Sequence, residues 1–123
     1  MIFTVSLTQN KDFLRLYKRG SFVNSPLCVV YYLPNRLPYN RLGITTGKKV
    51  GKAVLRNRAR RVIRAAYQQS EIFFPVGFDI VVVARPAICT EKSDSIREFL
   101  ISQVVRKINK SNQSSQKSIK EQL

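Results

Sequence analysis

The sequence predicts an α+β domain, a two-layer sandwich in which helices pack on one small sheet. Segments with the apolar spacing of amphipathic helices alternate with short segments rich in β-branched and aromatic residues. Hydrophobic residues make up 44% of the 123 positions, which is enough to build one core in one domain. The predicted order is α-β-β-β-α-β-α, and a parallel strand pair joined by the second helix would make the sheet mixed.

The first half of the chain is predicted to begin with a helix that leads into strands. Thr8 is placed to cap a helix over about 9–19, and Gly20 follows as a helix stop signal. The next segments are rich in β-branched and aromatic residues and are bounded by turn residues. These extended segments lie at 21–23, 27–33 and 41–46.

A basic, glycine-containing loop at 48–52 leads into the strongest helix pattern of the chain, over about 53–69. A Pro- and Gly-containing break separates this helix from a strand at 78–85, and Pro86 ends the strand. The almost wholly apolar centre of that strand indicates a buried position in the sheet.

The last helix is predicted over about 95–107, where Ser95 and Glu98 have the spacing of a capping box. The sequence after it consists mainly of Ser, Gln and Lys, with almost no apolar side chain to bury. We therefore expect a single domain over 1–108 and a disordered polar tail over 109–123.

The basic residues are concentrated in one part of the chain. Residues 13–70 contain 13 Lys or Arg and no Asp or Glu, whereas residues 71–123 contain 8 basic and 6 acidic residues. Like charges repel one another, and a polyanionic partner would relieve the repulsion. The net charge of +15 therefore predicts a nucleic-acid partner. An anionic membrane surface and a merely solvated basic face are the alternatives.

The composition excludes several classes of protein. The chain has no histidine and only two cysteines, so neither a Cys₂His₂ zinc site nor a Ser–His–Asp or Cys–His catalytic site can form. Cys28 and Cys89 are typical of reduced thiols in a cytoplasmic protein. The apolar runs are far shorter than the roughly 20 residues of a membrane span, and a signal-peptide pattern is missing at the first residues.

The helix over 53–69 has one apolar face and one basic face. At about 100° per residue, Leu55, Ala59, Val62, Ile63 and Ala66 fall on one side and the arginines on the other. The apolar side is expected to dock on the sheet, so the arginines should point outward. No acidic residue lies three or four positions away to neutralise them. A guanidinium fork suits phosphate oxygens and can stack on bases, so this face predicts RNA or DNA binding. The membrane alternative is weaker, because the apolar face lacks the Trp or Phe that interfacial helices use.

The segment 48–64 reads Lys-Lys-Val-Gly-Lys-Ala-Val-Leu-Arg-Asn-Arg-Ala-Arg-Arg-Val-Ile-Arg. It resembles the signature of the bacterial ribonuclease P protein component, which is centred on an Arg-Asn-Arg motif. The resemblance continues in order from about residue 7 to residue 108. Asp12-Phe13 and 17–20 resemble the first helix of the family; the segments that resemble its strands are 29–31, 41–43 and 79–86.

The resemblance implies a fold of the ribosomal-protein-S5-domain-2-like type, with a left-handed β-α-β crossover through the basic helix. General handedness rules favour the opposite hand. The resemblance also implies the function of a protein subunit in the ribonuclease P ribonucleoprotein. This endoribonuclease removes the 5′ leader from precursor tRNA and gives the mature 5′ end.

The resemblance assigns two surfaces. The basic helix and its loop would bind the catalytic RNA, and the positions that match are Lys48, Lys49, Lys52, Arg56, Asn57, Arg58, Arg60, Arg61 and Arg64. A cleft between the first helix and the sheet would bind the precursor-tRNA leader through Phe13, Tyr17 and Tyr31. Periodicity alone also allows Phe13 and Tyr17 to be core residues, and strand alternation sends Tyr32 to the opposite face as core.

The resemblance implies that the RNA subunit, in a 1:1 complex with the protein, holds the catalytic Mg²⁺. We therefore expect no catalytic and no metal-binding residue in this chain, and no membrane partner. Asp94 and Glu98 could share a metal ion at i, i+4 spacing, but a solvated helix face is the expected role. The rival functions are a non-catalytic RNA-binding protein, such as a ribosomal protein, and a DNA-binding protein.

Overall fold

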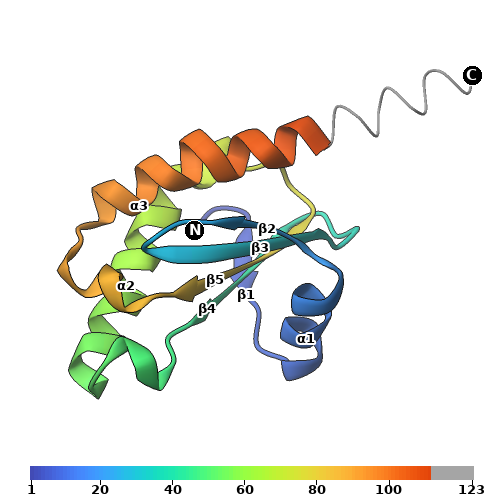
Figure 1. Ribbon diagram of the computed structural model, residues 1–123. Helices are drawn as coiled ribbons and strands as arrows, with labels where there is room; N and C mark the ends of the chain where they lie inside the picture. The colour runs from blue at the N-terminus through green and yellow to red at the C-terminus, as the bar shows by residue number, and fades with distance from the viewer. Residues whose placement is uncertain (112–123) are drawn as a thin grey trace, which may run out of the picture.

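A computed structural model describes residues 1–111 and has a mixed five-stranded sheet with helices on both faces (Figure 1). The α+β class is as predicted. The elements are β1 (Thr4–Ser6), α1 (Asn10–Arg19), β2 (Ser21–Asn24), β3 (Cys28–Pro34), β4 (Asn40–Thr45), α2 (Ala53–Ser70), β5 (Phe78–Ala84) and α3 (Ser93–Phe99). Short 3₁₀ turns lie at Lys48–Val50, Glu71–Phe73 and Pro86–Thr90.

The strands lie in the order β1-β4-β5-β3-β2. β4 is parallel to β5, and α2 is the crossover between them, so the predicted mixed sheet is confirmed. β1 adds a second parallel pair with β4, and the sequence did not predict this strand. A three-residue strand is too short to show an alternating pattern, and its partner is distant in the chain.

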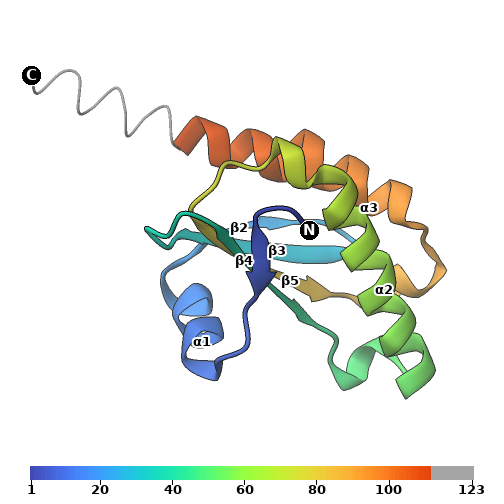
Figure 2. The ribbon, with the colours of Figure 1, turned by 180° about the vertical axis from the view of Figure 1, so that it is seen from behind.

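Strand alternation divides the apolar side chains between two faces. On one face, Ile80 and Val82 of β5 pack with α2 and α3 in the larger core. On the other face, Val81 packs with Leu7 and with Leu16 of α1. Figure 2 shows α1 on the opposite side of the sheet from α2 and α3. The two-layer prediction did not include this partial third layer.

The predicted N-terminal caps of α1 and α3 are wrong, whereas α1 ends at Arg19, immediately before Gly20, as predicted. α1 begins after Gln9, not Thr8, and no side chain caps it among the described residues. Gly20 has an ordinary φ of −71°, and it is glycine because a Cβ there would lie 2.6 Å from the carbonyl oxygen of Leu16. α3 begins at Ser93, two residues before the predicted Ser95–Glu98 capping box.

The last helix is longer than predicted. Beyond α3 the chain continues through a π-helical segment, Leu100–Val105, and stays helical to residue 111. Residues 109–111 of the predicted tail therefore extend this helix, and 112–123 lie outside the described residues. Within the described part of the chain, no helix has the length and apolar character to cross a membrane.

Candidate nucleic-acid interface

The loop before α2 presents its lysines to solvent. Lys48 and Lys49 form an exposed 3₁₀ turn with the buried Val50. Gly51 has φ of 138°, a value that favours glycine, and a Cβ there would lie 2.7 Å from Leu55 Cδ1. α2 then starts at Ala53, and within the described residues no side chain caps its first N–H groups. These N–H groups can therefore donate to an anion.

α2 buries the face that the sequence predicts. Ala59, Ile63, Ala66 and Tyr67 are buried against the sheet and α3. This docking turns the opposite face of the helix to solvent. Leu55 departs from the prediction, since 38% of its surface stays exposed at the first turn.

The arginines of α2 do not all point to solvent. Arg60, Arg61 and Arg64 are exposed, whereas Arg56 and Arg58 are half-buried. The two terminal nitrogens of Arg58 donate to the carbonyl oxygens of Cys89 and Glu91, at 2.9 and 3.0 Å. The expectation that every arginine of this face points outward is therefore wrong for Arg58.

A small pocket lies at the N-terminal end of α2. It has a volume of about 270 Å³ and is lined by Thr46, Ala53, Arg56, Asn57 and Arg60. The buried Nε of Arg56 has no hydrogen-bond partner among the described residues, and Arg60 Nη1 donates to Ile44 O at 3.0 Å. Two guanidinium groups beside free helix N–H groups make this a pocket suited to a phosphate.

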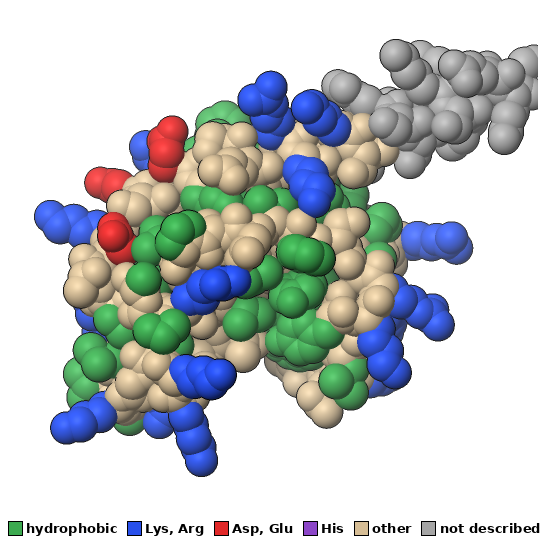
Figure 3. All heavy atoms as spheres, in the orientation of Figure 1, with side chains coloured by type: hydrophobic (Ala, Val, Ile, Leu, Met, Phe, Trp, Pro, Cys, Tyr) green, Lys and Arg blue, Asp and Glu red, His purple; other side chains and the backbone are tan. Residues whose placement is uncertain are grey.

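We define the basic surface as Lys48–Val50 together with the solvent-facing side of α2, and among the described residues none of its cations forms an ion pair with a carboxylate. Asp12, Asp79 and Glu71 are buried. In the view of Figure 3 the visible Asp and Glu side chains gather at one end of the molecule, and Lys and Arg side chains lie around the rest. The basic surface is therefore free to attract a polyanion.

A second candidate surface lies between α1 and the sheet, where a hollow is lined by Leu7, Phe13 and Gly43. We call this hollow, together with Tyr17 and Tyr31, the aromatic cleft. The ring of Phe13 packs on Gly43 of β4, where a Cβ would lie only 2.6 Å from Phe13 Cζ. Tyr17 and Tyr31 meet edge to face with centroids 5.0 Å apart. Tyr17 is 38% exposed, and Phe13 and Tyr31 are half-buried. The three predicted residues therefore come together, while Tyr32 is buried on the other face as expected.

Sequence reasoning missed Phe22. Its ring lies 5.9 Å from that of Tyr31, and 54% of its surface is exposed. The signal was the strand register: β2 pairs Phe22 with Tyr31, so the two side chains share a face. That register is set by pairing between strands, and a single strand pattern does not contain it.

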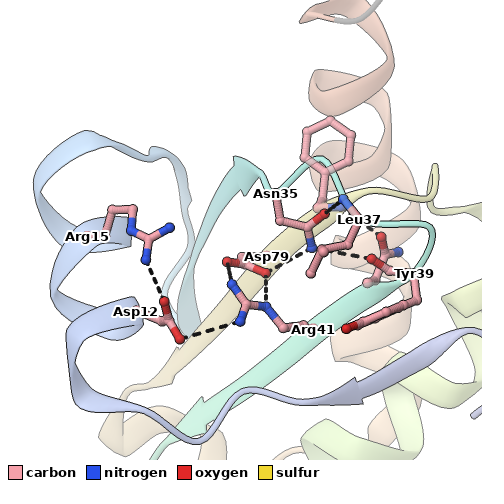
Figure 4. A network of polar contacts seen from close by, with 9 residues as sticks. Asp12, Arg15, Asn35, Leu37, Tyr39, Arg41 and Asp79 are labelled. Carbon is pink, nitrogen blue, oxygen red and sulfur yellow. Dashed lines mark hydrogen bonds and ion pairs between the residues drawn. The ribbon is translucent and has the colours of Figure 1, made fainter.

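A buried ionic network fixes α1 to the sheet (Figure 4). Arg41 of β4 lies between Asp79 of β5 and Asp12 of α1, with nitrogen–oxygen distances of 2.7 Å and 3.4 Å. Asn35 also donates to Asp79, and Arg15 pairs with Asp12 from the exposed side. Because Asp12 precedes Phe13, this network sets where the aromatic rings of α1 stand over the sheet.

Among the described residues, no three Cys, Asp or Glu side chains lie close enough together to hold a metal ion. Asp94 and Glu98 are exposed on α3. Cys28 and Cys89 are free, and burial raises the pKa of the Cys28 thiol to about 11. A thiol with such a raised pKa is unreactive.

A basic helix on one face of the sheet and exposed aromatic rings on the other are typical of a nucleic-acid-binding α+β protein. Comparison with known proteins gives the particular family. The family model for ribonuclease P matches residues 3–109. The ribonuclease P protein component of Alkaliphilus metalliredigens is 35% identical over 102 residues, which cover 83% of this chain and 91% of that protein. The protein component of Clostridioides difficile is 48% identical over 85 residues, covering 67% and 73% of the two chains.

Solved structures agree with the sequence matches. The RNase P protein of Thermotoga maritima superposes with a TM-score of 0.73 at 32% identity, covering 82% of this chain and 96% of that one. The RNase P protein of Staphylococcus aureus gives 0.71 at 36% identity, covering 85% and 94%. The chain belongs to the bacterial ribonuclease P protein component family, the protein subunit of the endoribonuclease that matures tRNA 5′ ends. Membership implies association with the RNase P RNA.

Proposed function

We propose that the basic surface binds the RNase P RNA and that the aromatic cleft binds the 5′ leader of precursor tRNA. The observation that carries this proposal is the exposure of Arg60, Arg61 and Arg64 beside the pocket that Arg56 lines. Cationic side chains that contact a phosphate backbone release its counterions, and this release favours binding.

The contributions of the basic residues differ. Arg61 and Arg64 contact phosphates directly, as do the lysines of the loop, and Asn57 and Arg60 line the pocket with Arg56. Arg58 acts by positioning, since it ties α2 to the turn Pro86–Thr90 and the residue after it. The RNA-binding set is Lys48, Lys49, Lys52, Arg56, Asn57, Arg58, Arg60, Arg61 and Arg64.

The cleft suits a single strand. Tyr17 and Tyr31 offer partly exposed ring faces, and Phe13 is held against Gly43 at the inner end. Stacking of a base on an aromatic ring contributes roughly 1–3 kcal/mol and tolerates any base sequence. A leader of variable sequence is the kind of substrate that such a surface binds.

The RNA subunit holds the catalytic Mg²⁺ in this proposal, and the protein, bound 1:1, raises the affinity for substrate. The three buried carboxylates already have partners in the protein, which supports the assignment of the Mg²⁺ to the RNA. Asp12 and Asp79 pair with Arg41, and Glu71 accepts hydrogen bonds from backbone N–H groups. Two free thiols support a cytoplasmic location. The S5-domain-2-like relation and the left-handed crossover through α2 stay predictions.

The RNA-subunit surface is tested by measuring binding to the cognate RNase P RNA over a range of salt concentrations. Arg61→Ala and Arg64→Ala should weaken binding, and each should flatten the log–log salt dependence by roughly 0.7–0.9. Arg97→Ala removes one exposed arginine from α3 and should leave the slope unchanged. A double Arg61/Arg64 variant with the affinity and slope of the unmodified protein would contradict the assignment.

The cleft is tested with the reconstituted holoenzyme, using precursor and mature tRNA under conditions that prevent cleavage. Tyr17→Ala and Tyr31→Ala should weaken binding of precursor tRNA and leave mature tRNA nearly unaffected. Tyr17→Phe keeps the ring and loses only the 3.3 Å contact of its hydroxyl with Thr45, so it should bind almost normally. Equal losses on both tRNAs would make these residues structural.

A further inference from the structure

The row of aromatic rings continues past the cleft to an outer strand of the sheet. β2 pairs Phe22 with Tyr31, so both side chains point to the face on which α1 lies. The centroid distances are 5.0 Å from Tyr17 to Tyr31 and 5.9 Å from Tyr31 to Phe22. Tyr31 is thus flanked by a ring on each side, and Phe22 is the outermost and most exposed of the three.

Phe22 is held in place although its ring is exposed. Its strand is hydrogen-bonded to β3, and Lys107 Nζ donates to the carbonyl oxygen of Phe22 at 2.8 Å. The side chain nevertheless keeps 54% of its surface in solvent. A ring presented in this way on a fixed strand is preorganised to stack on a planar partner.

A positive group lies on the same face. Strand alternation in β5 places Val81 and Val83 on the α1 side of the sheet. Arg85, two residues after Val83, points to the same side. The Arg85 guanidinium donates to the side-chain oxygen of Asn24, which stands two residues after Phe22 on β2. Arg85 is exposed, so its remaining N–H groups are available to a phosphate.

We propose that the single-stranded RNA path continues from Tyr31 onto Phe22 and Arg85. The protein then binds leader nucleotides beyond those held between α1 and the sheet. This inference rests on the proposed leader-binding function and extends its surface. Rings on adjacent strands of a sheet stack successive bases in single-stranded RNA recognition, and a nearby arginine neutralises the backbone. Figure 3 shows exposed hydrophobic side chains with Lys and Arg around them on this side of the molecule.

The test measures the affinity of the holoenzyme for precursor tRNAs whose leader is lengthened one nucleotide at a time, without cleavage. For the unmodified protein, affinity should rise once as the leader fills the aromatic cleft. It should rise a second time when the leader becomes long enough to reach Phe22. Phe22→Ala and Phe22→Leu should lose that last rise, at least about fivefold for one stacked base, and Phe22→Tyr should keep it. Arg85→Ala should reduce the salt slope by about 0.7, and only for the long leaders.

Phe73 provides a matched control, because it is also 54% exposed but lies in the turn after α2. Phe73→Ala should leave the dependence on leader length unchanged. The proposal is overturned if Phe22→Ala behaves like the unmodified protein at every leader length, or if it weakens mature and precursor tRNA equally. It is also overturned if the free protein forms a dimer that Phe22→Ala abolishes, which would assign the ring to a contact between copies.

Tyr17→Ala, measured on the same substrates, separates failure of this inference from failure of the proposed function. If Tyr17→Ala weakens the binding of short leaders and Phe22→Ala changes nothing, the cleft binds the leader and the extension is wrong. If neither variant responds to the leader, the cleft itself is not the leader site.

Discussion

Arg41 forms a bidentate ion pair with Asp79: Nε lies 2.7 Å from Oδ1, and Nη2 lies 2.7 Å from Oδ2. The third nitrogen of the same guanidinium reaches Asp12 of α1 at 3.4 Å. One side chain thus joins two neighbouring strands to the helix that forms a wall of the cleft (Figure 4). The hydrogen bond to Asp79 raises the pKa of Arg41, so the arginine remains charged.

Replacing Arg41 by methionine should destabilise the protein by about 2–4 kcal/mol, because it leaves the buried carboxylate of Asp79 without its cation and Asp12 with Arg15 alone. Denaturant unfolding measures this change. Arg15→Ala is the control, since the Arg15 side chain is 45% exposed and pairs with Asp12 only at the surface. Its removal should cost less than about 1 kcal/mol. Equal effects of the two changes would contradict the structural role of Arg41.

Arg58 and Arg61 are close in sequence but should respond differently to substitution. Arg58→Ala removes the donors to the carbonyl oxygens of Cys89 and Glu91, and should lower the free energy of unfolding by about 1–3 kcal/mol. Arg61 is exposed, so Arg61→Ala should change stability by less than about 0.5 kcal/mol and affect RNA binding instead. Thermal unfolding of the free protein separates the two effects, and an unchanged Tm for Arg58→Ala would be the contrary result.

Gly43 leaves room for the ring of Phe13. An alanine Cβ there would lie 2.6 and 2.7 Å from two ring atoms, so Gly43→Ala must displace Phe13. We expect a loss of about 1–3 kcal/mol in stability and weaker binding of precursor tRNA by the holoenzyme. Gly47→Ala is the matched control, because no described atom lies within 4 Å of its Cβ position. A Gly43→Ala protein as stable as the Gly47→Ala protein would refute the close packing.

Glu71 anchors the N-terminal strand by accepting hydrogen bonds from the N–H groups of Ile2 and Phe3, at 2.7 and 3.3 Å. Burial acts to raise the pKa of this carboxyl, but these hydrogen bonds, together with Thr4 and the charge of the N-terminus, outweigh burial and the pKa is lowered. A lowered pKa contributes stability that is present above the ordinary glutamate pKa and is lost as pH falls through the folded-state value.

Unfolding measured over the acidic range should therefore show a smaller loss of stability for Glu71→Gln than for the unmodified protein. At neutral pH the same variant should be less stable by about 1–3 kcal/mol, because a charged acceptor is lost. Glu98→Gln changes an exposed carboxyl and serves as the control. Identical acid profiles for Glu71→Gln and Glu98→Gln would contradict the assigned role.

The purified protein should not cleave precursor tRNA, whereas the holoenzyme should. Changing Asp94 and Glu98 together to alanine should leave cleavage by the holoenzyme within a few-fold, because both carboxylates are exposed on α3. The measurement is the rate of leader removal at several Mg²⁺ concentrations, with and without the RNA subunit. A metal-dependent nuclease activity of the protein alone that disappears in this double variant would show that the protein carries the chemistry.

The sequence determined the features that depend on local pattern. The apolar spacing of residues 53–69 placed α2 within one residue at each end and identified its buried face through Ala59, Ile63 and Ala66. The Arg-Asn-Arg segment then led to the correct family. These predictions succeed because the helical period places side chains on one face whatever the rest of the chain does.

The way in which distant segments meet is set by tertiary packing. It placed α1 on the face opposite α2, paired β1 with β4, and brought Phe22 beside Tyr31. It also directed the Arg58 side chain to the carbonyl oxygen of Cys89, whereas Arg61, another arginine of the same helix, points to solvent. Each of these outcomes depends on strand register and on contacts between residues far apart in the chain. Local periodicity does not specify them, because the same alternating pattern allows several pairings until the whole sheet and its two cores have packed.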